Sequence, residues 1–121
     1  MTTPLEISKS YWDAECRRDL DAVMSYYHDD ATYEDAGGLR RGHAEIRANY
    51  EEHIQAFPAL NVAILREFPS GDSSAIEFEA SLIAATGEHL LVRGVNVVDV
   101  RDGKFTSVRS YEDTPKPTCR M

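Results

Sequence analysis

Three polar residues of this chain, Tyr11, Asp35 and Asn96, stand where their side chains could take part in proton transfer. Asp35 ends a short β-prone run before Gly37-Gly38, and a carboxylate in a partly apolar site has its pKa raised towards neutrality yet still ionises. The phenol of Tyr11 can donate a hydrogen bond to a negatively charged oxygen when water is excluded. Asn96 interrupts an apolar strand face, and a buried amide without partners costs about 1–3 kcal/mol. These types of residue predict an apolar pocket that holds a few polar groups.

Each of the three residues also has a purely structural interpretation. Asp35 can instead form an Asx turn that leads into the glycine pair. Tyr11 can pack in the core as one aromatic residue of a helical stripe. Asn96 can bond to the backbone at a β-bulge beside Gly94. Convergence of the three side chains on one hollow would favour catalysis, whereas an Asp35 carboxylate bonded to loop amides would favour a binding protein.

The sequence carries none of the common patterns for metal or cofactor binding. Its four histidines do not follow a metal-ligand spacing such as HExxH. No nucleophile elbow, P-loop or Rossmann glycine loop is present. We therefore expect no metal and no organic cofactor. His53 shares an apolar helical stripe, where a histidine is more often a satisfied core residue than a catalyst. Strand alternation would point Glu112 inward, and the alternative is a place at a helix-lined rim or in solvent.

The first half of the chain predicts three helices that would position these residues. The first begins at Pro4 and shows apolar residues at three- and four-residue spacing. Asp19 can cap a second, shorter helix with Met24 and Tyr27 on its inner side. The third runs over residues 42–57, because a glycine opens it and a proline stops it.

The second half of the chain predicts a β-meander. Its long β-branched segments are residues 60–68, 74–85, 89–101 and 104–113. Helices followed by antiparallel strands indicate an α+β fold, with the helices against the apolar face of the sheet. The opposite face, with Val95, Val97 and Tyr111, would suit a two-fold contact between two copies. The alternative is a partly solvated face that binds nothing.

Length, composition and charge narrow the class of protein. The 121 residues form one domain, with a core of about 5–114 and a loose tail at 115–121. Apolar residues make up 42% and charged residues 28% of the chain, which is ordinary for a globular protein. The net charge of −8 disfavours nucleic acid and anionic membranes as partners.

Location and redox state follow from what the sequence does not contain. No apolar run approaches the roughly 20 residues of a membrane span, and residues 1–5 do not resemble a signal peptide. A cytoplasmic location is the default expectation. Cys16 and Cys119 form no CxxC pair, so both are expected to be free thiols.

Several stretches together resemble a known family. Residues 19–35 and 41–46 look like the first half of SnoaL-like and ketosteroid-isomerase-like proteins, and residues 56–60 and 100–113 look like the second half. The resemblance implies an NTF2-like (cystatin-like) cone. This is an α+β fold in which three N-terminal helices pack on a strongly curved, mainly antiparallel sheet, and it is usually dimeric.

The resemblance also implies roles for the three polar residues. In ketosteroid-isomerase-like proteins, the aspartate of a pair similar to Glu34-Asp35 is the general base that moves a proton between carbons. The 24-residue separation of Tyr11 and Asp35 resembles that between the oxyanion tyrosine and this base. Asn96 stands roughly where those isomerases carry a protonated aspartic acid that donates to the oxyanion; an amide there is a weaker donor.

Two functions from different classes are compatible with this resemblance, because the fold hosts both. The leading expectation is a cofactor-independent isomerase or aldol-type cyclase that acts on an apolar carbonyl compound. The alternative is a non-catalytic domain that binds a small apolar ligand. Arg93 and Arg109 fall on the outer sheet face, which disfavours the Asp-Arg-Asp chemistry of epoxide hydrolases with this fold. Beyond the three catalytic candidates, the residues expected to contact the ligand are Trp12, Met24, Tyr27, Tyr50, His53, Ile54, Phe57, Phe78, Val98 and Glu112.

Overall fold

The computed structural model describes residues 2–118. Its first helix begins at Pro4, as the sequence predicts. Helix α1 spans Pro4–Cys16. Thr3 and Glu6 cap its start reciprocally, since the Thr3 hydroxyl accepts from the Glu6 amide and the Glu6 carboxylate accepts from the Thr3 amide. The buried side of α1 consists of Pro4, Ile7, Ser8, Tyr11, Trp12, Ala14 and Glu15. This helix therefore brings Tyr11 and its neighbours into the interior.

The second helix is shorter than expected. Helix α2 spans Leu20–Met24 and begins where Asp19 accepts a hydrogen bond from the Ala22 amide at 3.1 Å. Strand β1, Tyr27–Asp35, follows at once. The prediction that Tyr27 lies on a helix was wrong: the residue begins β1, opposite Phe105 of β6, because pairing between the strands overrides a weak local helical preference. Its side chain is still fully buried.

The third helix begins and ends as the glycine and proline signals predict. Strand β2, Gly38–Arg41, returns antiparallel to β1, and helix α3, Gly42–Ala56, starts directly after it. Gly42 has a φ of 83°, a conformation that a residue with a side chain adopts only at a cost. Helix α3 then stops just before Pro58.

The second half of the chain forms the predicted meander. Its strands are β3 (Ala59–Ser70), β4 (Ser73–Ile83), β5 (His89–Arg101) and β6 (Lys104–Glu112). Asp102 and Gly103 turn β5 into β6 with φ values of 53° and 77°, as a two-residue type I′ turn requires. The expected loose tail contains the two-residue strand β7, Lys116–Pro117, which pairs with β5.

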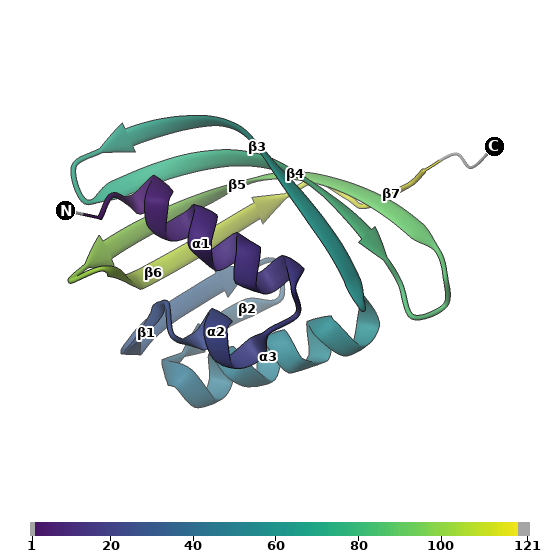
Figure 1. Cartoon of the computed structure of the whole chain (residues 1–121), viewed down its shortest axis with the longest axis horizontal. Helices are drawn as coiled ribbons and strands as arrows, with labels where there is room; N and C mark the ends of the chain where they lie inside the picture. The colour runs from purple at the N-terminus through teal and green to yellow at the C-terminus, as the bar shows by residue number, and fades with distance from the viewer. Residues whose placement is uncertain (1, 119–121) are drawn as a thin grey trace.

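The strands form one curved sheet in the order β2-β1-β6-β5-β4-β3, which is antiparallel except where β1 runs parallel to β6. Helix α1 crosses the concave side of this sheet, and α3 lies beside β1 and β2 (Figure 1). Helices packed on the concave side of a strongly curved sheet are the arrangement of an NTF2-like cone. None of the helices within residues 2–118 is long and apolar enough to cross a membrane.

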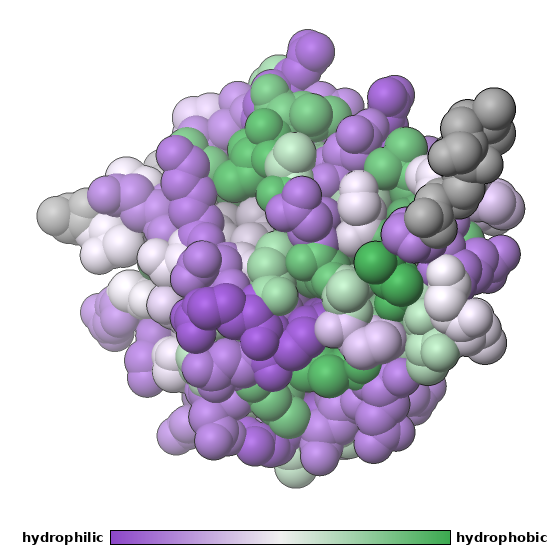
Figure 2. Space-filling model, turned by 45° about the vertical axis from the view of Figure 1, so that its right-hand side comes forward, coloured by the Kyte–Doolittle hydropathy of each residue, from purple (hydrophilic) through white to green (hydrophobic). Residues whose placement is uncertain are grey.

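Alternation along β4 and β5 separates the two faces of the sheet as predicted. Ile76 and Phe78 on β4, and Asn96 and Val98 on β5, are buried on the helix side. The outer face carries ion pairs between neighbouring strands, such as Arg93 with Glu79 at 2.8 Å. Figure 2 shows one side of the molecule, where hydrophilic residues divide the apolar surface into separate patches.

Candidate functional site

A cavity of about 190 Å³ lies between α1, the end of α3 and the concave face of strands β3 to β6. This volume is smaller than the roughly 300–1,000 Å³ of pockets for drug-sized ligands. The walls are aromatic and aliphatic, with a few polar groups among them. The apolar lining is Trp12, Phe57, Leu60, Val62, Phe78, Ala80, Leu82, Leu90, Val92 and Pro115, and the polar lining is Tyr11, Glu15, Tyr33, His53, Asn96, Ser110 and Glu112.

Three tyrosine hydroxyls form a buried chain that ends at the cavity. The hydroxyl of Tyr50 on α3 bonds to that of Tyr11 on α1, and lies 2.7 Å from that of Tyr27 on β1. Each phenol has one proton to donate. If Tyr27 donates to Tyr50 and Tyr50 to Tyr11, the Tyr11 proton is free for a group in the cavity. In this arrangement the hydroxyls of Tyr50 and Tyr27 orient the proton of Tyr11, the donor predicted from the sequence.

Burial fixes the protonation state of these phenols. Removal from water raises the pKa of Tyr11 and Tyr50 well above the usual value, and it also raises the pKa of Tyr27. The nearby Glu15 carboxylate raises them further. All three side chains therefore stay neutral near pH 7 and remain hydrogen-bond donors.

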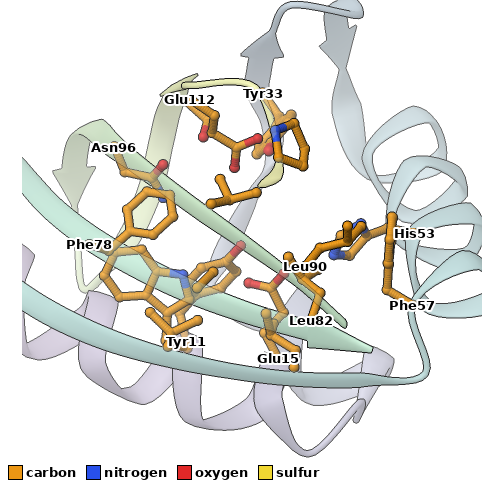
Figure 3. Close-up of a pocket in the computed structure, with 17 residues that line it drawn as sticks. Tyr11, Glu15, Tyr33, His53, Phe57, Phe78, Leu82, Leu90, Asn96 and Glu112 are labelled. Atoms are coloured by element: carbon orange, nitrogen blue, oxygen red, sulfur yellow. The ribbon is translucent and has the colours of Figure 1, made fainter. Parts of the chain in front are cut away.

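Glu15 is a buried acid that the sequence reasoning missed. It lies one helical turn after Tyr11 and is only 7% exposed. Burial raises the pKa of its carboxyl group to about 7, while the Tyr11 hydroxyl and the Arg18 guanidinium oppose this rise. Figure 3 shows Tyr11 and Glu15 projecting from α1 into the same part of the cavity. The signal in the sequence was an acid four residues after Tyr11 and three after Trp12, which places it on the buried stripe.

Asn96 projects into the cavity from β5, as its position in the strand predicts. It is 6% exposed and lies opposite Ser110 of β6. Its Oδ1 atom is buried, and no hydrogen-bond partner for it lies within residues 2–118. Oxygen and nitrogen of an amide can exchange by a flip of the side chain, so Asn96 offers either a donor or an acceptor to a ligand. A buried polar atom without a partner is uncommon and calls for such an explanation.

Asp35 occupies a different place from the other two candidates. Its Oδ1 accepts from the Gly37 amide at 2.8 Å and pairs with the Arg40 guanidinium at 2.5 Å. The carboxylate lies at the mouth, near Ser110 and Glu112, and does not line the cavity that holds Tyr11 and Asn96. The three side chains therefore do not converge on one hollow. The geometry has the Asx turn that the sequence allowed. By the criterion set from the sequence, this arrangement favours binding over catalysis by Asp35, and a role of Asp35 as general base remains a prediction.

Two other titratable residues line the cavity as expected. Burial lowers the pKa of His53 to about 4, so its imidazole is neutral near pH 7. Its ring lies 5.2 Å from that of Phe57, measured between centroids. Glu112 stands at the mouth, where burial of its carboxyl end and the charge of Asp35 raise its pKa. Near pH 7, His53 therefore adds no positive charge that could offset the negative charges of Glu15 and Glu112 in the cavity.

The structure divides the predicted ligand contacts into two groups. Trp12, His53, Phe57, Phe78 and Glu112 line the cavity. Five others do not, and this corrects the expectation: Met24, Tyr27, Tyr50 and Val98 pack in the core behind the cavity wall, and Ile54 is half-buried elsewhere on α3. Periodicity shows which side of an element faces inward, but not how far along the cone the packed core gives way to open space.

The described residues 2–118 bring together no group of three or more His, Cys, Asp or Glu side chains that could hold a metal ion. Cys16 is a half-buried free thiol, as expected. Cys119 lies outside the described residues.

Comparison with known proteins places this geometry in a family. A model of the SnoaL-like domain matches residues 9–108. No curated protein sequence matches the chain. The solved structures that it resembles include a Δ5-3-ketosteroid isomerase from Mycobacterium sp., with 23% identity, a TM-score of 0.85, and 98% of this chain and all of that chain covered.

Two further solved structures share the fold. An epoxide hydrolase of M. tuberculosis, described as LEH-like, has 24% identity and a TM-score of 0.77, with 88% of this chain and 80% of that chain covered. TerC, crystallised with polyporic acid, has 20% identity and a TM-score of 0.80, with 90% of each chain covered. At such identities the structures establish the NTF2-like fold and not a shared activity. From the domain match over residues 9–108, the chain belongs to the SnoaL-like family.

Proposed function

We propose that this protein is a cofactor-independent enzyme that moves a proton next to the carbonyl group of a small apolar compound, as an isomerase or an aldol-type cyclase does. The observation that carries the proposal is the phenol of Tyr11, which faces a mostly apolar cavity and is backed by the buried hydroxyls of Tyr50 and Tyr27. A fixed donor in a site shielded from water stabilises the negative oxygen that forms when a ketone loses an α-proton.

The cavity also limits the kind of ligand. Among the described residues that line it, two are acids and none is lysine or arginine. Anions such as phosphate esters and carboxylates are therefore poor ligands, because they would lie beside Glu15 and Glu112 without a counter-charge. A neutral ketone with one or two rings suits the volume, and a larger compound would extend through the mouth.

The alternative function is binding without catalysis. The observation in its favour is that Asp35, the acid implied by the family resemblance, is held in a turn and an ion pair. A binding protein would use the same cavity, with Tyr11 and Asn96 holding a ligand oxygen.

Exchange of hydrogen for deuterium in a ketone ligand distinguishes catalysis from binding. We expect the protein to accelerate deuterium incorporation from D₂O into 2-tetralone, an apolar two-ring ketone, at the carbon next to the carbonyl group. Removal of one such donor typically costs about 10²–10³-fold in rate, so Tyr11→Phe should lose most of the acceleration. Tyr26→Phe is the control, since Tyr26 is absent from the cavity lining. Binding of 2-tetralone without any exchange above that in buffer would establish the alternative.

A further inference from the structure

We infer that Glu15 is the acid–base residue of this cavity, and that its carboxylate takes the α-proton of a ketone whose oxygen is held by Tyr11. This inference rests on the proposed function and assigns the base to α1 instead of to Asp35. A pairing of phenol and acid on one helix gives the cavity both groups that enolisation needs.

The spacing of the two residues suits the geometry of a ketone. Side chains at positions i and i+4 of a helix are neighbours, with their Cβ atoms about 5–6 Å apart. Tyr11 and Glu15 have this spacing on the buried side of α1, and both line the cavity. The oxygen and the acidic carbon of a ketone are attached to the same carbonyl carbon. A ligand oxygen at Tyr11 therefore places the adjacent carbon near Glu15.

The carboxylate of Glu15 is buried although no cation is paired with it among the described residues. Glutamate is almost never this buried unless it is paired. Within residues 2–118, no cationic side chain forms a salt bridge with it. Apolar side chains such as Trp12 and Leu60 line the same cavity. Its close polar neighbour is the Tyr11 hydroxyl, and an acid kept in a mostly apolar cavity without a cationic partner is typical of a functional site.

The titratable and charged groups around Glu15 come from four elements. They are Tyr11, Cys16 and Arg18 at α1, Tyr27 and Tyr33 on β1, Tyr50 on α3 and Glu112 on β6. Arg18 is the only cation in this set, and its guanidinium is committed to the carbonyl oxygens of Phe57 and Glu15 at the ends of two helices. With a pKa of about 7, Glu15 is present in both protonation states near neutral pH, which suits a group that must accept and return a proton.

Asp35 is less suited to the same step. Its carboxylate already accepts from Gly37 and Arg40, and it lies outside the cavity that contains Tyr11. Both contacts are to Oδ1, so the other oxygen could accept a proton only if the carboxylate turned toward the cavity, whereas Glu15 already lines it.

The step is balanced within the ligand and the side chain. The α C–H bond of the ketone breaks, an O–H bond forms on Glu15, and the electron pair moves onto the carbonyl oxygen, which accepts from Tyr11. In the second half, the O–H bond of Glu15 breaks and a C–H bond forms, at the same carbon or at a conjugated one. Nothing is oxidised or reduced, and no other reactant is needed.

Exchange of 2-tetralone in D₂O at several pH values tests the inference, with Glu15→Gln compared with Asp35→Asn. General acid–base groups contribute about 10²–10⁴-fold, so we expect Glu15→Gln to lose at least 100-fold. Asp35→Asn, which keeps an acceptor for the Gly37 amide, should stay within a few-fold of the wild type. The wild-type rate should rise with pH through about 7. Binding of 2-naphthol, a planar mimic of the enol, and a thermal melt show whether each variant is folded.

The outcomes separate this inference from the proposed function. Full exchange activity in Glu15→Gln, with loss in Asp35→Asn, overturns the role of Glu15 and leaves the proposed function standing. No acceleration by the wild-type protein overturns both. If Glu15→Gln does not fold, the wild-type pH profile decides: a rise centred near 7 supports Glu15, and one centred below about 5, where ordinary carboxyl groups titrate, overturns it.

Discussion

The Tyr27 hydroxyl lies 2.7 Å from the Tyr50 hydroxyl in the fully buried interior, and Tyr50 in turn bonds to Tyr11 at the cavity. This contact joins the first strand, the third helix and the first helix through polar atoms in a mainly apolar core. A phenol whose oxygen already accepts a hydrogen bond is a stronger donor through its own proton. The Tyr11 donor therefore depends on Tyr50, which does not line the cavity.

Tyr50→Phe should accordingly weaken both stability and exchange activity. The change leaves the hydroxyls of Tyr11 and Tyr27 without their shared partner, and an unsatisfied buried hydroxyl costs about 1–3 kcal/mol. Chemical denaturation measures the loss of stability. Tyr27→Phe is the matched control, since it removes only the far end of the chain and should reduce exchange less than Tyr50→Phe does. Equal effects of the two variants on exchange would mean that the chain does not assist Tyr11.

The stability of the protein should depend on pH through Glu15. Its pKa is about 7 in the folded state and 4.5 when exposed, so the folded protein binds more protons between these values. The free energy of unfolding therefore falls as pH rises through this range. At 1.36 kcal/mol per pKa unit, the full penalty above pH 7 is about 3 kcal/mol. Burial of Glu15 is thus a cost to folding at neutral pH.

Glu15→Gln should remove this penalty. Urea unfolding of the variant and the wild type at pH 5 and pH 8 measures it, and we expect the variant to gain up to about 3 kcal/mol relative to the wild type between the two pH values. His53 acts in the opposite sense: with a folded pKa of about 4 against an ordinary 6.5, it favours folding as pH rises from 4 to 6.5. Because both the variant and the wild type contain His53, its effect on stability cancels in the difference between them. A difference in stability that does not vary with pH would show that Glu15 is not a buried acid.

Asn96→Leu separates a ligand-binding role from a structural one. The Oδ1 atom has no partner within residues 2–118, so its replacement by an apolar group of similar size should leave the melting temperature unchanged or raise it. Loss of one hydrogen bond of about 0.5–1.5 kcal/mol should weaken binding of 2-naphthol by about 2- to 10-fold. A fall in melting temperature with unchanged binding would instead mean that Asn96 serves the β5 backbone.

The outer face of the sheet is expected to join two copies of the chain. Tyr111 is 57% exposed there, beside Val97 and Val95 on the neighbouring strand. Tyr111→Arg should therefore shift the protein from dimer to monomer in sedimentation equilibrium. Leu39→Arg is the control, because Leu39 is also a large hydrophobic residue and is 52% exposed, but it lies on β2, at the edge of the sheet. A wild-type monomer at all concentrations would contradict this expectation.

Local signals in the sequence were enough to predict most of the scaffold. Pro4, Gly42 and Pro58 mark helix boundaries through constraints on their own backbone, and strand alternation placed Phe78 and Asn96 on the helix side. These signals act over a few residues and hold in any surroundings. The start of β1 at Tyr27 was missed because it depends on β6, which lies far along the chain.

The site was less predictable because it depends on packing between distant elements. Glu15 looks like an ordinary surface acid when only its charge is considered, although its spacing from Tyr11 places it on the side of α1 that packs against β3, β4 and β5. For Asp35, an aspartate two residues before a glycine is equally compatible with a turn and with an active-site base. The burial of Tyr11 was predictable, because it is required whether the residue is a donor in a pocket or an aromatic residue packed in the core.

A crystal structure of the protein with 2-naphthol tests the central claim most directly, since the phenol mimics the enol that the cavity should hold. We expect its oxygen within about 3 Å of the Tyr11 hydroxyl, its rings against Trp12 and Phe78, and the Glu15 carboxyl group beside the carbon next to the C–O bond. A naphthol bound at the mouth beside Arg40, or a cavity closed to it, would contradict the account.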